Sequence, residues 1–286
     1  ESDHIPLLAL LARPGASSAG EAAHTRGTII ISGIEHPALR EQTAQIKNLG
    51  YNVVTVNPDK NGFITPESIV SRLTPDTLYV TVMAVNNETG CIQPVYEIAD
   101  AITKSCAGKR RPRFHVDCVQ AAGKIPLDLT HKGIDSAAFS AHKICGPRGI
   151  GILYLAYELE PFLRGGGQEN NVRSGTENMF GALAFADCLK KYWIGTAFTQ
   201  QNTGSSMLPN DGTMHFALQQ KLTADFIASL SSIPSCTLVP PLRADLSAQK
   251  QFSPYVVQAA FKNIPGEVMV RALSAKGFYI STGSAC

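Results

Sequence analysis

The chain has 286 residues, of which 44% are hydrophobic and 17% are charged, and its formal net charge is +2. This length and composition suffice for one large core, or for one large and one smaller domain. The near-neutral charge argues against a highly charged partner. The one basic run, residues 109–113, is better explained as a solvated turn before a buried strand, so we expect no direct nucleic-acid binding.

The hydrophobic segments and the cysteines restrict where the protein works. No apolar stretch approaches the roughly 20 residues that a membrane helix needs, and residues 1–4 do not resemble the start of a signal peptide. The seven cysteines are scattered and form no CxxC pair. This pattern argues against a disulfide framework or a zinc site and predicts a cytoplasmic protein whose cysteines are mostly small core residues.

Strand and helix patterns alternate over the first two thirds of the chain. A short helix is expected over 7–12 and a surface loop over 14–24. Apolar runs predict strands at 28–31, 51–56, 77–85, 113–119, 136–140 and 151–155. Helical spacing predicts helices over 37–49, from 66 onward and over 94–106, with Pro37 in a first turn and Thr65 as an N-cap before Pro66. Buried strands separated by helices indicate an α/β fold with a largely parallel central sheet.

The composition changes near residue 195, where a polar stretch rich in Gly, Ser and Asn predicts a linker over 195–211. A helix over 215–230, a strand over 256–261 and a helix over 266–276 that ends at Gly277 follow it. We therefore expect a large domain over residues 1–195. Residues 196–286 are expected to form the linker and part of a smaller α+β domain.

Two segments carry residues suited to binding pyridoxal 5′-phosphate (PLP). Asp117 ends an apolar strand, and the carboxyl edge of an α/β sheet is where such folds place ligands. Lys143 follows Ser140, Ala141 and His142 and precedes a Gly/Pro loop. Taken singly, Asp117 is as readily a turn or N-cap residue and Lys143 a structural one. Together they supply a lysine for the coenzyme aldehyde, an acid for the pyridine nitrogen and donors for the phosphate.

Several short motifs of the sequence resemble motifs of the cysteine desulfurases, the NifS/IscS-like group of class-V aminotransferases with the fold-type I PLP architecture, and they occur in the same order. The motifs are Glu35-His36-Pro37-Ala38-Leu39, Val85-Asn86-Asn87-Glu88-Thr89-Gly90, His115-Val116-Asp117 with Gln120, Ser140-Ala141-His142-Lys143, Gly165-Gly166-Gly167-Gln168-Glu169, Arg173-Ser174-Gly175-Thr176-Glu177-Asn178 and Ser281-Thr282-Gly283-Ser284-Ala285-Cys286. The resemblance covers nearly the whole chain.

The resemblance implies one role for each matching residue. Lys143 would bind PLP covalently and then remove the substrate Cα proton, and Asp117 would pair with the pyridine nitrogen. The other cofactor contacts would be Gln120 to the ring hydroxyl, Ser140 and His142 to the phosphate, His36 on the ring face, Asn87 near ring and substrate, and Thr176 to the phosphate of a neighbouring subunit. Without the resemblance, His36 is explained as a residue at the start of a helix, Asn87 as a turn residue and Cys286 as a residue with no part in catalysis.

The implied reaction converts L-cysteine to L-alanine and leaves a persulfide on Cys286, with His36 as an acid or base. The implied partners are a second copy of the chain and a sulfur-acceptor protein for iron–sulfur clusters or tRNA thiolation. A selenocysteine lyase or another C–S lyase is the alternative within the fold, and a non-catalytic scaffold is the alternative outside enzymology. A nucleotide-binding α/β protein is disfavoured because the sequence has no GxGxxG or GxxxxGKS word.

Two parts of the family pattern do not match any residue of this sequence. They are a phosphate-binding turn before the glutamate that matches Glu1, and an arginine, beyond the cysteine that matches Cys286, that binds the substrate carboxylate. We therefore expect residues 1–286 alone to bind PLP weakly and to turn over slowly.

Overall fold

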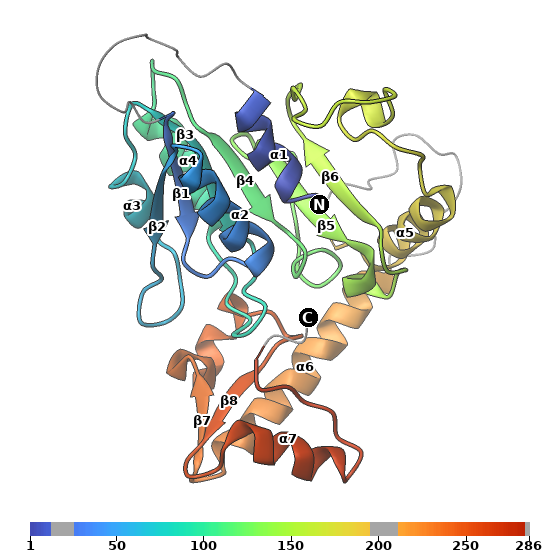
Figure 1. Cartoon of the computed structure of the whole chain (residues 1–286). Coiled ribbons are helices and arrows are strands. Elements are labelled where there is room, and N and C mark those ends of the chain that lie inside the picture. The colour runs from blue at the N-terminus through green and yellow to red at the C-terminus, as the bar shows by residue number, and fades with distance from the viewer. Residues whose placement is uncertain (13–25, 195–210, 284–286) are drawn as a thin grey trace.

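A six-stranded mixed sheet forms the centre of the computed structural model, which describes residues 1–12, 26–194 and 211–283 (Figure 1). The strands are β1 (Thr28–Ser32), β2 (Asn52–Val56), β3 (Thr77–Met83), β4 (Arg113–Asp117), β5 (Ser136–Ser140) and β6 (Gly151–Leu155), in the order β2-β1-β3-β4-β5-β6. The first five are parallel to their neighbours, and β6 is antiparallel to β5. The predicted α/β class with a largely parallel sheet is confirmed.

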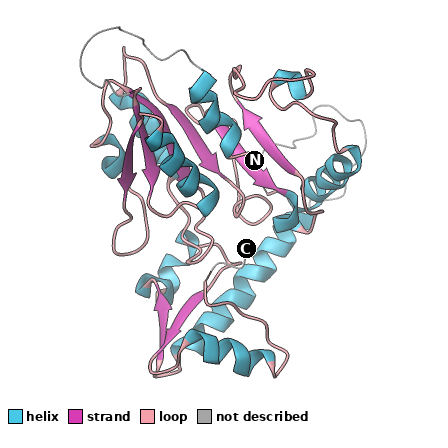
Figure 2. Cartoon of the chain, in the orientation of Figure 1, coloured by secondary structure: helices cyan, strands magenta, loops and turns pink. Residues whose placement is uncertain are grey.

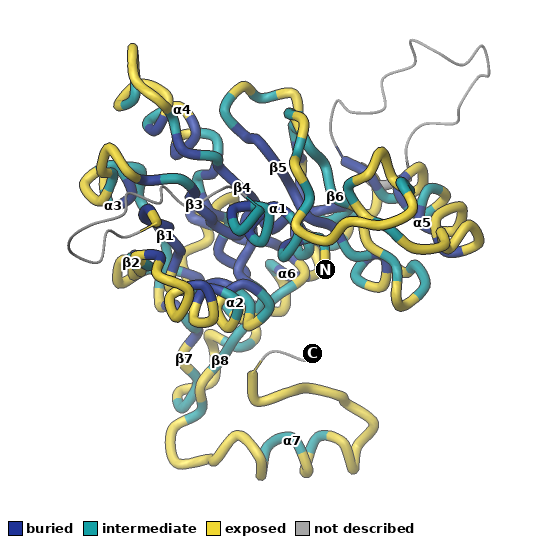
Figure 3. The backbone as a smooth tube through the Cα atoms, turned by 45° about the horizontal axis from the view of Figure 1, so that its top comes forward, coloured by how far each residue is buried: buried dark blue, intermediate teal, exposed yellow. Residues whose placement is uncertain are grey.

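Helices cover both faces of this sheet, as Figures 1 and 2 show. They are α1 (His4–Leu8), α2 (Pro37–Asn48), α3 (Pro66–Val70), α4 (Val95–Ser105) and α5 (Met179–Tyr192). Alternate residues of a strand point to opposite faces, and β1 illustrates this: Ile29 and Ile31 belong to the core cluster that includes residues of α1 and α2, whereas Ile30 belongs to the larger cluster that includes residues of α3, α4 and α5. The tube in Figure 3 is accordingly dark blue along most of β1, β3, β4 and β5.

Local sequence signals begin two of the helices as predicted. His36 is the N-cap of α2, where its Nδ1 accepts a hydrogen bond of 3.2 Å from the Ala38 amide, and Pro37 follows in the first turn. Thr65 caps α3 by accepting a hydrogen bond from the Ser68 amide. Each cap satisfies a backbone N–H that has no partner within the helix.

A second, smaller group of elements lies below the sheet in Figure 1. It comprises α6 (Asp211–Ser231), the antiparallel pair β7 (Cys236–Val239) and β8 (Gln258–Phe261), and α7 (Gly266–Ser274). Backbone hydrogen bonds from Ser253 to Gly90 (2.8 Å) and from Ile92 to Gln251 (2.9 Å) join it to the loop after β3. The predicted boundary at residue 195 stays a prediction.

Some elements differ from expectation. Helix α5 and strand β7 were not predicted, α1 begins at His4 rather than residue 7, and β3 ends at Met83 rather than residue 85. Of the six cysteines in the described part of the chain, Cys91 and Cys118 are buried and Cys106 and Cys188 are partly buried against the core, whereas Cys145 is exposed. None of the described helices is both long and apolar enough to cross a membrane.

Candidate functional site

A cavity of about 1150 Å³ opens where strands β3, β4 and β5 reach their carboxyl ends. Eight of the nine predicted site residues line it: His36, Asn87, Asp117, Gln120, Ser140, His142, Lys143 and Thr176. They come from five separate stretches of sequence, which the sheet topology brings to one edge. The ninth, Cys286, lies outside the described residues.

Asp117 supplies a buried carboxylate at the end of β4. Only 4% of the residue is exposed, and its Oδ1 accepts a hydrogen bond of 2.8 Å from the Val119 amide. Within the described residues no group donates to its second oxygen, Oδ2. Burial, and then the negative charges of Asp3 and Glu35, raise the pKa of this carboxyl well above its usual value. A cationic ligand atom beside Oδ2 would restore the ionised form.

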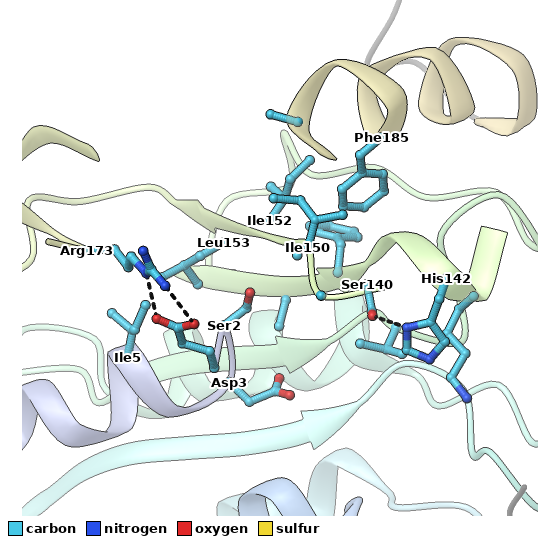
Figure 4. Close-up of a pocket in the computed structure, with 18 of the residues that line it drawn as sticks. Ser2, Asp3, Ile5, Ser140, His142, Ile150, Ile152, Leu153, Arg173 and Phe185 are labelled. Carbon is cyan, nitrogen blue, oxygen red and sulfur yellow. Dashed lines mark hydrogen bonds and ion pairs between the residues drawn. The ribbon is translucent and has the colours of Figure 1, made fainter. Parts of the chain in front are cut away.

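Basic and hydroxyl groups follow β5. Ser140 Oγ lies 2.9 Å from His142 Nδ1, as the close-up in Figure 4 shows. Burial, together with the positive charges of Lys143, Arg148 and Lys124, lowers the pKa of His142. The Lys143 ammonium has no hydrogen-bond or ion-pair partner among the residues that the structure describes, so it is available to a ligand in the cavity.

His36 faces the cavity from the start of α2, directly after a buried acid. Its Nδ1 accepts the Ala38 amide hydrogen, so in the neutral ring the proton resides on Nε2. Burial lowers the pKa of His36, which favours this neutral form. Glu35 Oε1 accepts hydrogen bonds from Ser32 Oγ (2.5 Å) and the Met83 amide (2.7 Å) and thereby ties the ends of β1 and β3 together. Glu35 thus fixes the turn that presents His36.

Two neighbouring asparagines in the loop after β3 have different roles. Asn86 is buried, and its Oδ1 accepts hydrogen bonds from the Glu88 and Thr89 amides and from the Thr89 hydroxyl. The turn expected of this segment is therefore made by Asn86. The neighbouring Asn87 is half-buried and lines the cavity instead.

Residues absent from our predicted site also line or border the cavity. Arg173 Nε donates to Glu1 Oε1 at 2.8 Å, which Figure 4 shows, and both residues line the wall. Lys124 Nζ donates to Gln120 Oε1 at 2.6 Å. Lys124 follows Gln120 by four residues in a run of turns, where this spacing alone does not identify the contact. The contact between Glu35 and Met83 joins residues 48 apart and likewise leaves no local signal.

Comparison with known proteins places the chain in a family. Residues 15–286 match the family described as aminotransferase class-V. The chain belongs to the class-V aminotransferases. Within this family, a protein of Lactobacillus delbrueckii subsp. bulgaricus described as a NifS/IcsS protein homolog is 36% identical over 261 residues, covering 90% of this chain and 61% of that protein. Cysteine desulfurase IscS of Methanosarcina thermophila is 32% identical over 260 residues, covering 90% of this chain and 57% of that protein.

Solved structures show the same class-V aminotransferase architecture. A structure described as a NifS-like protein superposes with a TM-score of 0.78 at 28% identity, covering 98% of this chain and 68% of that one. DndA from Streptomyces lividans superposes with a TM-score of 0.68 at 30% identity, covering 87% of this chain and 63% of that one. The chain spans about three fifths of the length of the two sequence relatives.

The donor set fits the PLP that this class-V aminotransferase family implies. Asp117 is a buried acid whose Oδ2 accepts no hydrogen bond from the described groups, so it can accept one from a protonated pyridine nitrogen. Lys143 offers a primary amine to the same cavity, and Ser140 and His142 offer hydrogen-bonding groups suited to a phosphate. Asp117 ends β4 and the basic groups follow β5, so the two kinds of group come from the ends of neighbouring strands.

Proposed function

We propose that the protein is a PLP-dependent cysteine desulfurase that converts L-cysteine to L-alanine and transfers the sulfur to Cys286 as a persulfide. One observation carries the proposal: a lysine, a buried aspartate and a neutral histidine line the same cavity at the carboxyl edge of the sheet. The relatives that are named cysteine desulfurases support it.

Each cofactor contact is assigned to a group of suitable chemistry. Lys143 would hold PLP covalently, Asp117 would accept from the pyridine nitrogen, and Gln120 would donate to the ring hydroxyl. Ser140 and His142 would bind the phosphate, Asn87 would lie near ring and substrate, and the flat imidazole of His36 would cover the ring face. When bound, PLP supplies an electron sink for a bond broken at the substrate Cα.

The residues of the chain then move protons and sulfur. Lys143 Nζ takes the proton from the substrate Cα once it is no longer bound to the coenzyme. His36 carries an exchangeable proton on Nε2 and serves as acid or base for the substrate. The Cys286 thiolate would attack the substrate sulfur, the carbon–sulfur bond would break with its electron pair left on the carbon, and protonation of that carbon would give alanine beside the enzyme persulfide.

We further propose that the enzyme is a homodimer in which Thr176 reaches the neighbouring subunit's cofactor. Thr176 is exposed and precedes α5. Three apolar side chains of α5 are more than half exposed: Met179 (62%), Phe180 (88%) and Leu183 (61%). Contiguous exposed apolar side chains mark protein interfaces. A second copy seated on this face would bring its own cavity near Thr176. A cytoplasmic sulfur-acceptor protein would complete the reaction.

The test uses the complete natural protein with PLP and L-cysteine. We expect visible absorbance from lysine-bound coenzyme, release of alanine, and a mass increase of one sulfur atom on Cys286. Lys143→Ala should lose the absorbance and alanine release, whereas Cys286→Ser should keep the absorbance and lose the adduct. Full alanine release by Lys143→Ala would refute the proposal. Faster release from selenocysteine than from cysteine would favour the lyase alternative.

A further inference from the structure

A short hydrogen bond fixes the orientation of one cavity side chain. Lys124 Nζ lies 2.6 Å from Gln120 Oε1. The two ends of a glutamine amide are hard to distinguish from shape alone, but an ammonium group has three donors and no acceptor. An ionised Lys124 is therefore compatible only with the amide oxygen of Gln120. The Gln120 NH₂ group must then point away from Lys124.

We propose that Lys124 is a positioning residue. It holds the Gln120 amide so that the NH₂ group, rather than the amide oxygen, faces an oxygen of the bound coenzyme and donates a hydrogen bond to it. This inference rests on the proposed function, in which Gln120 contacts the ring hydroxyl. Only one of the two amide orientations can donate to an oxygen. Without Lys124 the amide can rotate, and its oxygen can face the ligand oxygen and repel it.

The surroundings of Lys124 support a role in the site over a role in stability. Lys124 is partly buried, and Gln120 is its one hydrogen-bond partner in the described chain, with no carboxylate among its partners. Burial, and then the positive charge of Lys143, lower the pKa of Lys124 to about 8, while Cys145 opposes this. A partly buried cation without a counter-ion destabilises a fold. At neutral pH the group nevertheless remains mainly an ammonium donor.

The backbone around Lys124 is held independently of its side chain. The amides of Ala121 and Ala122 donate to Cys118 O, and those of Lys124 and Ile125 donate to Ala121 O, all at 3.0 Å. Replacing the Lys124 side chain therefore leaves the turn intact. We expect Lys124→Met to fold, with a free energy of unfolding equal to or above that of the natural protein.

A double-mutant cycle on the complete natural protein tests the inference. The variants are Lys124→Met, Gln120→Ala and the double substitution, and the measurements are the PLP dissociation constant and the pH titration of the bound coenzyme's visible absorbance. A net hydrogen bond is worth about 0.5–1.5 kcal/mol, so Lys124→Met should weaken PLP binding roughly threefold to tenfold and shift the titration. In the Gln120→Ala background the same substitution should change neither quantity.

Two controls separate positioning from simple charge. Lys124→Arg keeps a donor that cannot accept and should restore most of the affinity. Lys47→Met removes an exposed lysine at the end of α2 and should change neither the affinity nor the titration. An equal loss of affinity from Lys124→Met with and without Gln120 would overturn the inference, because a general attraction for the coenzyme would then explain Lys124.

A coenzyme-free measurement keeps the inference separate from the proposed function. In ¹⁵N NMR spectra of the ligand-free protein, the Gln120 side-chain NH₂ signals should titrate near pH 8 with Lys124 and stop doing so in Lys124→Met. The Lys143→Ala and Cys145→Ser variants show whether either neighbour is the group that titrates. Absence of PLP binding by the natural protein would refute the proposed function alone, whereas Gln120 signals that ignore Lys124 would refute this inference.

Discussion

Replacing Glu35 with glutamine should change how the stability of the chain depends on pH. Glu35 is 3% exposed, and its Oε1 accepts hydrogen bonds from Ser32 and from the Met83 amide. Its other oxygen, Oε2, is buried and has no hydrogen-bond partner among the described residues. A glutamine is nearly isosteric, and its amide oxygen can accept the same two hydrogen bonds. Glu35→Gln therefore removes the ionisation while keeping the contacts.

The size of the expected change in stability follows from the raised pKa of Glu35. Burial raises the pKa of Glu35 from 4.5 to about 8. Below pH 4.5 both the folded and the unfolded chain hold the proton, so the contribution to stability is fully present. Between these two values only the folded chain keeps it, so stability falls as the pH rises through 8. At about 1.36 kcal/mol for each pKa unit, the full loss is on the order of 5 kcal/mol.

The assay is urea unfolding of the purified chain and of the variant at intervals from pH 5 to pH 9. The variant should lose less stability than the natural chain over this range, and should be the more stable of the two at pH 9. Glu41→Gln, at an exposed position of α2, is the matched control and should leave the pH dependence unchanged. Parallel curves for Glu35→Gln and the natural chain would show that Glu35 ionises normally and would refute the reasoning.

Three further substitutions test the loop after β3, the exposed face of α5 and the buried aspartate. Asn86→Ala should lower the free energy of unfolding by roughly 1–3 kcal/mol in urea titrations, because the Glu88 and Thr89 amides lose their buried acceptor; an unchanged midpoint would contradict this. Phe180→Asp should shift the sedimentation of the protein from dimer to monomer, and an unaltered dimer would exclude this face. Asp117→Asn removes a carboxyl whose pKa is raised by burial. In the ligand-free form above neutral pH it should therefore be at least as stable as the natural chain, yet bind PLP more weakly by equilibrium dialysis; equal affinity would exclude contact with the ring nitrogen.

Strands were easier to predict than their directions. The runs at β1 and β3 are buried on both faces and are mostly apolar, whereas β4 is buried although it alternates polar and apolar residues. The direction of β6 depends instead on its connection. Residues 141–150 link β5 to β6, which is shorter than the dozen or more residues that a parallel crossover needs. The length of the connection therefore predicts the direction of β6, which its apolar pattern does not.

The sequence pattern did not predict helix α5, because the apolar residues of this helix lie on two of its sides. Phe185 and Leu189 face the core, whereas Met179 and Phe180 are exposed. Apolar residues on both sides weaken the single hydrophobic stripe that marks a surface helix. The exposed apolar residues that obscure the helical pattern are also the residues that an interface on the outer side of α5 would require.

Eight residues that line the cavity were predicted to share one site, but most of their interactions were not predictable. Eight named residues line one cavity because strand ends meet at one sheet edge, a rule that needs only the topology. The bond between Glu35 and Met83 depends on tertiary packing across neighbouring strands. Hydrogen bonding within a pair such as Gln120 and Lys124 depends on side-chain rotamers, which spacing alone does not determine.

The arrangement of ionisable groups around the cavity favours a ligand of mixed charge. Asp117, at the end of β4, is a desolvated acid with one oxygen open to a donor, and its pKa is raised accordingly. His142 and Lys143 form a basic side, where the positive charge of Lys143 contributes to the lowered pKa of His142. Lys143 also favours the ionised form of Asp117, but burial dominates and keeps the pKa of that carboxyl raised. A ligand with a cationic ring nitrogen and an anionic phosphate complements both sides in only one orientation, so the same charges that favour binding also select the direction in which PLP enters.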